Sequence, residues 1–278
     1  MIQPLNEHIS VELKAPHEFA WLSDFGQVFC VFDHLISGNL CFGVQNRNEK
    51  LFIKYAGAQT LMYAGQARHA VDRLKRSAEL YTQLKYPALN PLQGWFEQKH
   101  GFGLVFPWFE GYALAPMEVH HQSLLQLPLA SRLAMFDRLM DLIVQASRQD
   151  VLAAGLALQH ILIDFTKQAV LLSSLSEFAR LPFSTPYPKL PGSPWFTPPE
   201  GYQVGQALDD TCNVYVLGAL AFVFFSLPNQ RVFTAWQAGR QLYDLATWAL
   251  QEDREERIQE AAQFQRQWRA TVLQMQGL

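Results

Sequence analysis

Asp209-Asp210-Thr211-Cys212-Asn213-Val214-Tyr215-Val216-Leu217-Gly218 is the stretch that decides the fold, because it opens the most apolar segment of the chain. A helix is predicted over residues 213–226. The apolar run over residues 214–227 is too short to span a bilayer, so this helix is expected to be buried in a globular domain. Upstream of it, strand-like segments come first and helix-like segments follow, which favours an α+β fold over alternating βαβ units.

The N-terminal third is predicted to be rich in strands. Short apolar runs of β-forming residues lie at 29–32, 40–44 and 51–54, with a polar turn before the last. Between Gln66 and Lys85 the apolar residues recur every three or four positions, which predicts an amphipathic helix that ends at Tyr86-Pro87. A further strand over residues 103–106 runs into Pro107. We therefore predict an N-terminal lobe over residues 1–106, a hinge over 107–111 and a C-terminal lobe over 112–278.

The C-terminal lobe is predicted to be mostly helical. Apolar residues share one face of a helix at 129–147, and two short strands flank a polar turn at 161–163 and 170–172. Residues 181–199 contain seven prolines and no periodicity, which predicts a long loop. A long polar helix is expected over residues 253–275.

Composition excludes several classes of protein. The chain has 278 residues, 49% of them apolar, which suffices for one large domain or two lobes. Its net charge is −3 and no block of basic residues marks a nucleic-acid surface. Three scattered cysteines fit a reducing compartment, and the N-terminus lacks the pattern of a signal peptide. We therefore expect a cytoplasmic protein with neither nucleic acid nor membrane as a partner.

Motifs in the N-terminal lobe resemble those of protein kinases. Gly38-Asn39-Leu40-Cys41-Phe42-Gly43 is similar to the family's glycine-rich loop, Gly-x-Gly-x-Phe-Gly, with Leu40 at the middle glycine. Lys54 ends the strand Leu51-Phe52-Ile53-Lys54 and resembles the lysine that pairs with the α- and β-phosphates of ATP. Leu104-Val105-Phe106-Pro107-Trp108 looks like the last strand of the lobe, with Phe106 as the gatekeeper. The resemblance implies a possible nucleotide site formed by Gly38, Phe42, Gly43, Lys54, Phe106 and Trp108.

The C-terminal lobe carries the more specific matches. Residues 192–200 resemble the end of an activation segment, which finishes at the Pro-Glu pair Pro199-Glu200. Residues 213–218 resemble Asp-Val-Tyr-Ser-Leu-Gly, with Asn213 in place of the aspartate, and residues 253–257 resemble Asp-Pro-x-x-Arg. The resemblance covers residues 25 to 262 approximately and implies a bilobal, protein-kinase-like fold. It also implies a buried ion pair between Arg257 and Glu200.

The catalytic positions of the family are replaced. Counting back from Ile161, which begins the strand after the catalytic loop, the His-Arg-Asp triplet falls on Ala153-Ala154-Gly155, so Gly155 occupies the place of the catalytic base. The two metal-binding positions fall on His160 and on or beside Ser174, and the helix glutamate that pairs with the lysine falls on Ser77. Because phosphoryl transfer depends on positioned charge, we expect no catalytic residue, no metal site and no ordinary kinase activity.

Several residues allow both a functional and a purely structural interpretation. Lys54 could bind a phosphate or be a surface lysine at a strand end; if buried, it needs an anion such as a nucleotide, Glu79 or Asp164. His160 could act as a base or metal ligand, or lie in the loop with its polar groups satisfied. His120 and His121 are expected to be an exposed pair rather than metal ligands.

Two further groups leave the same choice. The serines near Ser174, which are Ser173 and Ser176, are expected to be loop residues rather than nucleophiles. Trp195 and Phe196 could anchor a partner or pack in the core.

The resemblance therefore implies a pseudokinase similar to a degenerate bacterial serine/threonine protein kinase, acting as a regulatory or scaffolding module. ATP could bind weakly and without strong dependence on a metal. The alternative is an atypical transferase that uses Lys54, His160 or Asp164 to move a phosphoryl or nucleotidyl group. A third interpretation is a structural subunit whose nucleotide cleft is filled by side chains.

The expected partner is another protein. A second copy of the chain could also bind through the C-terminal helix, which carries Trp268, Val272, Leu273 and Met275. The simpler alternative is that this helix covers its own lobe.

Overall fold

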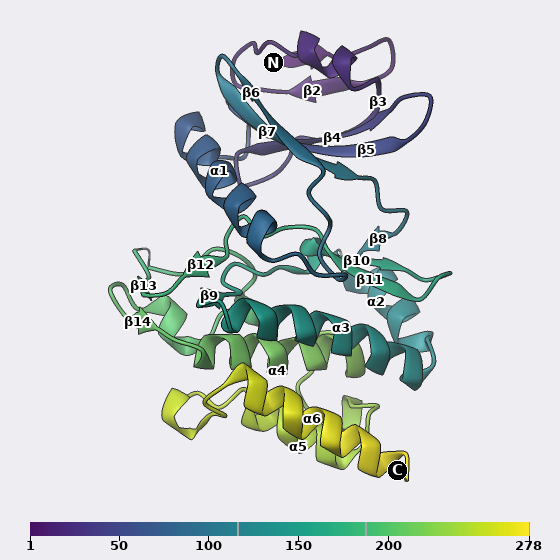
Figure 1. The fold of residues 1–278 in the computed structure, drawn as a ribbon, viewed down its shortest axis with the longest axis vertical. Coiled ribbons are helices and arrows are strands. Elements are labelled where there is room, and N and C mark those ends of the chain that lie inside the picture. The colour runs from purple at the N-terminus through teal and green to yellow at the C-terminus, as the bar shows by residue number, and fades with distance from the viewer. Residues whose placement is uncertain (116, 187, 278) are drawn as a thin grey trace. The chain divides into compact units, whose positions relative to one another are not determined.

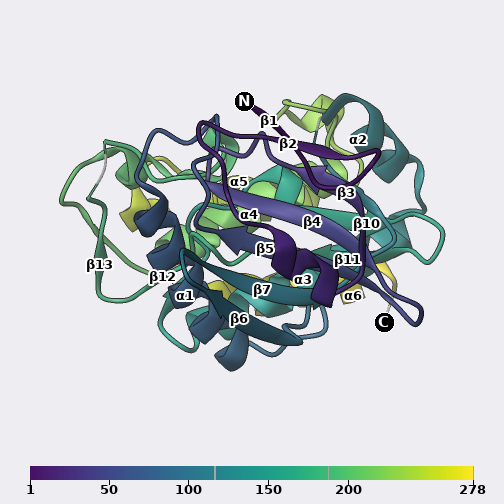
Figure 2. The same ribbon diagram turned by 90° about the horizontal axis from the view of Figure 1, so that it is seen from above.

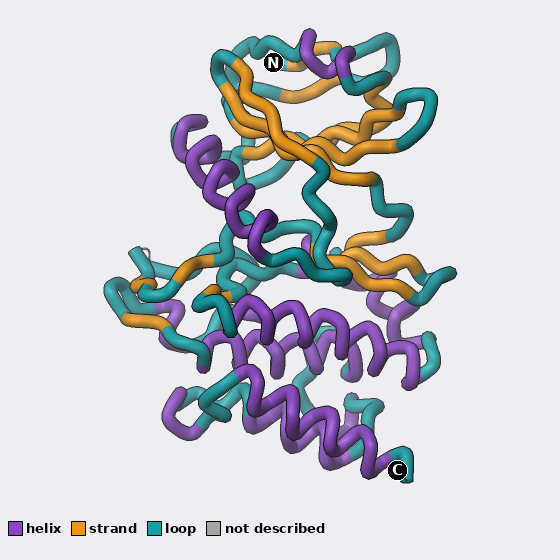
Figure 3. Tube along the Cα trace, in the orientation of Figure 1, coloured by secondary structure: helices purple, strands orange, loops and turns teal. Residues whose placement is uncertain are grey.

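The computed structural model describes residues 1–115, 117–186 and 188–277. The chain forms two compact units, an N-terminal unit of Met1–Lys85 and Asn90–Glu110, and a C-terminal unit of Tyr86–Leu89 and Gly111–Leu278. The fold is α+β, as predicted: the N-terminal unit contains an antiparallel sheet and one α-helix, and the C-terminal unit is mostly helical (Figure 3). The chain passes between the units at Lys85–Tyr86, at Leu89–Asn90 and at Glu110–Gly111, and the last of these lies at the end of the segment where the sequence suggests a hinge.

The N-terminal unit is built on a five-stranded antiparallel sheet with the strand order β3-β4-β5-β7-β6. Its strands are β3 (Gln27–Phe32), β4 (Asn39–Gln45), β5 (Lys50–Ala56), β6 (Gly94–Gln98) and β7 (Gly101–Pro107). A hairpin of β1 (Ile2–Pro4) and β2 (Ser10–Glu12) and a 3-10 helix (Ala20–Asp24) precede the sheet. Figure 2 shows β4, β5, β7 and β6 side by side. The four predicted strands lie within β3, β4, β5 and β7, whereas β6 and the β1–β2 hairpin were not predicted.

The two faces of this sheet are covered by different elements. On one face Leu40, Phe42 and Tyr55 pack into a core with Phe19 and Trp21. The other face carries the helix α1 (Ala67–Gln83), which packs against β5 and β7. Because side chains alternate along a strand, residues of β5 that do not face the Phe19–Trp21 core, including Lys54, face α1.

The C-terminal unit is formed by five helices and several short strands within the described residues. The helices are α2 (Met117–Gln126), α3 (Leu129–Ser147), α4 (Thr211–Phe225), α5 (Arg240–Trp248) and α6 (Ala261–Met275). In Figure 1, α3 and α4 lie side by side, and α5 and α6 pack against α4. Every residue of α4 is buried, which confirms the prediction of a buried helix. No helix in the described ranges is long and apolar enough to cross a bilayer.

The short strands of the C-terminal unit form three small sheets. One has the order β11-β10-β8 and consists of β8 (Tyr112–Ala113), β10 (Ile161–Asp164) and β11 (Ala169–Leu172). The other two pair β9 (Val151–Leu152) with β12 (Ala179–Arg180), and β13 (Phe183–Ser184) with β14 (Ala207–Leu208). β10 and β11 are the two strands predicted around a polar turn, and α3 has the predicted bounds.

The prediction of a long helix over residues 253–275 places the beginning of the helix wrongly. Residues 254–256 form a single 3-10 turn capped by Asp253, and the α-helix begins only at Ala261. Arg257 has an extended backbone, with φ −79° and ψ 162°. This conformation directs its side chain toward Glu200, and a continuous helix would prevent that contact. The helices α2 and α5 were not predicted.

The apolar face of α6 is covered mainly by the unit to which the helix belongs. Trp268 is 1% exposed, and its ring centroid lies 4.6 Å from that of Phe136 in α3 and 5.7 Å from that of Phe225 in α4. The expectation that Trp268 is covered by a partner is therefore wrong. Leu273 and Met275, at 50% and 42% exposed, are the residues of this group that remain on the surface.

Truncation of Trp268 should therefore destabilise the fold. We expect Trp268→Ala to lower the free energy of unfolding by about 3–5 kcal/mol, the usual cost of removing a buried large aromatic side chain. Leu273→Ala, on the same helix but exposed, should change it by less than about 0.5 kcal/mol. Urea denaturation of the two variants measures the difference. Equal midpoints for the two would contradict the packing of α6 described above.

Candidate functional site

Gly38 lies in the turn between β3 and β4 and has a left-handed backbone with φ +75°. A Cβ atom at this position would lie 2.5 Å from the ring of Tyr63. Arg73 of α1 donates a hydrogen bond to the carbonyl of Ser37, and its guanidinium lies 5.5 Å from the centroid of the Tyr63 ring. Turn geometry and contact with Tyr63 thus account for glycine here, and α1 fixes the turn in place.

Phe42 and Gly43 lie inside β4 rather than in the turn. Phe42 is fully buried and contacts Trp21 on the core face of the sheet, at 6.0 Å between ring centroids. Gly43 lies opposite a β-bulge between Val28 and Cys30. A Cβ atom on Gly43 would lie 2.5 Å from the Cys30 sulfur, so the bulge itself requires glycine. Packing within the sheet accounts for both residues without a phosphate.

Lys54 is buried, with 6% exposure, on the face of the sheet that carries α1. The interpretation of Lys54 as a surface lysine is therefore wrong. Its neighbour across the strand pair is Cys41. Burial raises the pKa of the Cys41 thiol to about 11, although the nearby charge of Lys54 acts in the opposite direction. Ser77 of α1 donates its hydroxyl to the carbonyl of Leu74 in the same helix, at 2.8 Å.

Large aromatic rings occupy this face of the sheet around Lys54. Phe106 is fully buried, with its ring centroid 4.9 Å from that of Tyr81 and 6.3 Å from that of Phe52. The half-buried Trp108 lies 4.8 Å from Phe29 and 6.3 Å from Phe52. Phe52 is two residues before Lys54 on the same strand and therefore on the same face. The side chains of the sheet itself fill much of the surface there.

Gly155 follows β9 in the C-terminal unit and has no room for a side chain. Its φ is +70°, and a Cβ atom would lie 2.1 Å from the Cβ of Glu177. Gly192 approaches the backbone of Gly155 so closely that a Cβ on Gly192 would lie 2.5 Å from the Gly155 carbonyl carbon. The backbone of Gly155 is therefore packed by two segments that come from beyond residue 170.

The neighbours of Gly155 pack as an apolar core. Leu152, Ala154, Leu190, Leu208 and Cys212 form a buried cluster. The adjoining cavity, which Gly155 also lines, has a volume of about 10 Å³. A cavity of this size holds one water molecule at most. The segment thus contributes to the core of the C-terminal unit.

His160 and Ser174 belong to a local network of backbone and hydroxyl groups. The carbonyl of His160 accepts hydrogen bonds from the amide of Ser173 at 2.8 Å and from its hydroxyl at 3.2 Å. Ser174 is buried and donates its hydroxyl to that of Ser176 at 3.2 Å. Ser173 is therefore engaged with the His160 carbonyl, and Ser174 with Ser176. In the part of the chain that the structure describes, no group of three His, Cys, Asp or Glu side chains could hold a metal ion.

Asp164 closes the hairpin between β10 and β11. Its carboxylate accepts hydrogen bonds from the amides of Lys167 at 2.9 Å and Thr166 at 3.0 Å, and the ammonium of Lys167 lies 3.5 Å away. The backbone hydrogen bond from Lys167 is the main cause that holds the pKa of Asp164 below its ordinary value. The sequence suggests Asp164 as an anion for Lys54 or as a cation ligand. In the structure its carboxylate stabilises the turn.

The expected exposed histidine pair is wrong for His121. His121 is 1% exposed, because α2 packs against α4, and its Nε2 lies 2.5 Å from the carbonyl oxygen of Val223. Burial holds the pKa of His121 below its ordinary value. His120 stacks on Tyr112 at 4.8 Å between ring centroids. Neither arrangement forms a metal site.

Asn213 ties the segment before Gly155 to the start of α4. Its side-chain oxygen accepts the amide of Ala153 at 2.8 Å, and its side-chain nitrogen donates to the carbonyl of Val151 at 3.1 Å. The same nitrogen donates to the carboxylate of Asp210 at 2.9 Å, whose other oxygen accepts the amide of Ala261 at the beginning of α6. An amide is required here because the side chain must donate as well as accept. The role of Asp210, which satisfies a free amide at the α6 N-terminus, was not predicted.

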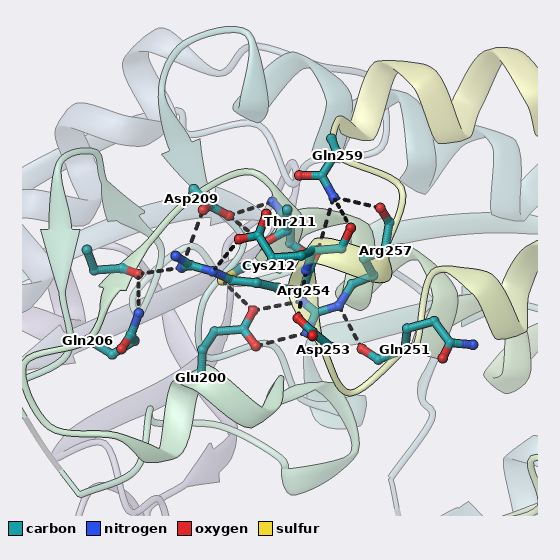
Figure 4. Close-up of polar contacts among 12 residues, drawn as sticks. Glu200, Gln206, Asp209, Thr211, Cys212, Gln251, Asp253, Arg254, Arg257 and Gln259 are labelled. Carbon is teal, nitrogen blue, oxygen red and sulfur yellow. Dashed lines mark hydrogen bonds and ion pairs between the residues drawn. The ribbon is translucent and has the colours of Figure 1, made fainter.

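The predicted ion pair between Glu200 and Arg257 is present and buried (Figure 4). Its two hydrogen bonds are 2.7 and 3.0 Å long, and the Arg257 side chain is 0% exposed. The other three guanidinium N–H groups donate to backbone carbonyls, those of Thr211, Gln251 and Glu252. Burial disfavours the charged carboxylate and is the largest single influence, but the hydrogen bonds and charge of Arg257, together with hydrogen bonds from a backbone amide and from Cys212, hold the pKa of Glu200 below its ordinary value.

Trp195 and Phe196 both pack within the C-terminal unit. Phe196 is buried, and the indole nitrogen of Trp195 donates to the carbonyl of Ala219 in α4 at 3.1 Å. The guanidinium of Arg231 lies 4.1 Å from the Trp195 ring centroid. Phe196 therefore packs in the core and is not a partner anchor. Trp195 is half-buried, so most of its side chain also packs within the unit.

Comparison of the sequence with protein-family models and with curated proteins gives no match.

Introducing an acidic residue at position 155 should damage the fold. An aspartate in Gly155→Asp would have to adopt a left-handed backbone, and its Cβ atom would collide with the Cβ of Glu177. Gly205 has a similar φ of +79° with open space around it, so Gly205→Asp isolates the cost of the backbone alone. We expect Gly155→Asp to lower the free energy of unfolding by about 1–3 kcal/mol more than Gly205→Asp, the usual cost of overpacking. Equal costs for the two variants, measured by urea denaturation, would contradict the packing around Gly155.

Proposed function

We propose that this chain is a pseudokinase: a protein with a protein-kinase-like fold that lacks phosphoryl-transfer activity and acts as a regulatory or scaffolding binding module. The order of its elements supports the kinase-like part, with an antiparallel sheet and one helix followed by a mostly helical unit. The Glu200–Arg257 ion pair supports it further, because the resemblance implies that pair.

The observation that carries the inactive part is the environment of Gly155. Phosphoryl transfer requires a carboxylate to orient the attacking hydroxyl and further carboxylates to hold magnesium. The position that the resemblance gives to the base is a glycine whose Cβ direction is blocked by Glu177. Ser174, at the position of a metal ligand, is engaged with Ser176. A chain of this kind binds rather than catalyses.

Nucleotide binding, if it occurs, should be weak and nearly independent of metal. Lys54 is buried and carries the positive charge that a phosphate would need. Phe52, Phe106 and Trp108 crowd the same face of the sheet, which leaves less room for a base. This crowding also favours the third interpretation, in which side chains replace the nucleotide.

The atypical transferase remains the second candidate function, and Asp164 is the observation against it. This carboxylate is already engaged by two backbone amides and Lys167 in the β10–β11 turn. A transferase that moves a phosphoryl or nucleotidyl group with a divalent cation would have to release Asp164 from that turn.

A transfer assay and a thermal-shift titration together test the proposal. We expect no incorporation of label from γ-labelled or α-labelled ATP into the protein or generic acceptors, with magnesium or manganese. ATP should raise the melting temperature little, and EDTA should not change that shift. A tightly bound ligand at a hundred times its Kd would add about 2.7 kcal/mol of stability. Incorporation that is lost in Lys54→Ala would overturn the proposal, and an EDTA-sensitive shift of that size would favour the transferase.

A further inference from the structure

The connection between α4 and α5 presents apolar side chains to solvent. Leu227, Val232 and Phe233 are 42%, 49% and 42% exposed. Phe233 contacts Tyr243 of α5, at 5.2 Å between ring centroids. We call these four residues, together with Arg231 and Arg240, the α4–α5 surface.

The charged groups of this surface are two arginines, one of which is paired with a carboxylate of α5. Residues 211–243 contain no Asp or Glu, and their charged residues are Arg231 and Arg240. Arg240 pairs with Asp244 on the next turn of α5, in an exposed ion pair of the kind that contributes little energy. Arg231 has no carboxylate within ion-pair distance among the described residues; its guanidinium donates to the hydroxyl of Tyr215 and the carbonyl of Trp195.

Both arginines are held in position by aromatic rings. Arg231 lies 4.1 Å from the ring centroid of Trp195, and Arg240 lies 5.1 Å from that of Phe233. The Tyr243 hydroxyl donates to the carbonyl of Arg231, and the Tyr243 ring lies 5.9 Å from the Arg240 guanidinium. Stacked guanidinium groups lose little entropy when they bind a carboxylate.

The backbone of the connection is also fixed before any partner arrives. Ser226 donates its hydroxyl to the carbonyl of Gln230, and the amide of Leu227 donates to the carbonyl of Ala235. The indole of Trp236 donates to the carbonyl of Gly239. A preorganised loop binds with a smaller ordering cost than a flexible one.

From this geometry we propose that the α4–α5 surface binds an acidic peptide segment of another protein, in which Asp or Glu residues flank an apolar side chain. The carboxylates would pair with Arg231 and Arg240, and the apolar side chain would pack against Val232 and Phe233. This inference rests on the proposed binding function and specifies the chemistry of the partner.

Selection from a phage-displayed library of random dodecapeptides on the full-length chain tests the proposal. The selected peptides, synthesised with a fluorescent label, are then titrated with the protein and followed by anisotropy. We expect them to carry Asp or Glu within three positions of an apolar residue. Their Kd should rise at least tenfold with Arg231→Gln. It should rise as much with Val232→Asp, because this change places a negative charge, which repels the peptide's carboxylates, on the surface.

Arg266→Gln, which removes an exposed arginine from α6, is the matched control and should leave the Kd unchanged. Val232→Asp keeps the test decisive if Arg231→Gln proves unstable, since the exposed Val232 contributes little to the fold. The proposal is overturned if no peptide is enriched, if the enriched peptides lack acidic residues, or if all three variants bind alike. Phosphate transfer by the wild type would instead overturn the proposed function, and leave the peptide result to be judged separately.

Discussion

The ion pair between Arg257 and Glu200 is the interaction on which the C-terminal unit depends most. It joins the end of the proline-rich loop to the segment before α6, and Arg257 adds hydrogen bonds to the carbonyls of Thr211, Gln251 and Glu252. All five donors of a fully buried guanidinium are thereby satisfied. Without such satisfaction a buried charge destabilises a fold by several kcal/mol. Residues 251–260 contain only the 3-10 turn of residues 254–256, and α6 begins at Ala261, whose amide donates to Asp210.

Glu200, Arg257 and Asn213, which the sequence suggests as structural residues, all form buried hydrogen bonds. Gly155 and Ser174, at the positions that the resemblance assigns to catalysis, contact neighbouring residues of the chain. Asn213 holds Val151 and Ala153, which precede Gly155, by two hydrogen bonds. Gly155 itself is packed against Glu177 and Gly192. The same segment is thus anchored by the polar side chain of Asn213 and packed closely against Glu177 and Gly192, an arrangement that stabilises the fold. Our proposal of a binding module follows from this contrast.

Sequence reasoning succeeded where local pattern determines structure. The periodicity of α3 gave its bounds. The pairing of Arg257 with Glu200, which lie 57 residues apart, was implied only by the resemblance to protein kinases. Sequence reasoning failed where distant segments decide the outcome. The burial of His121 depends on α4, a hundred residues away, and the burial of Lys54 depends on the helix that covers its strand. The beginning of α6 was missed because the helical pattern before it is overridden by the Arg257–Glu200 contact.

A double-mutant cycle on Glu200 and Arg257 tests the central claim that this buried pair anchors the C-terminal unit. Glu200→Ala and Arg257→Ala each leave one buried charge alone, so each should lower the free energy of unfolding by about 3–5 kcal/mol. The double variant leaves no uncompensated charge and should cost little more than either single change, which gives a large coupling energy. Single variants within about 0.5 kcal/mol of wild type, or costs that simply add in the double variant, would contradict the account.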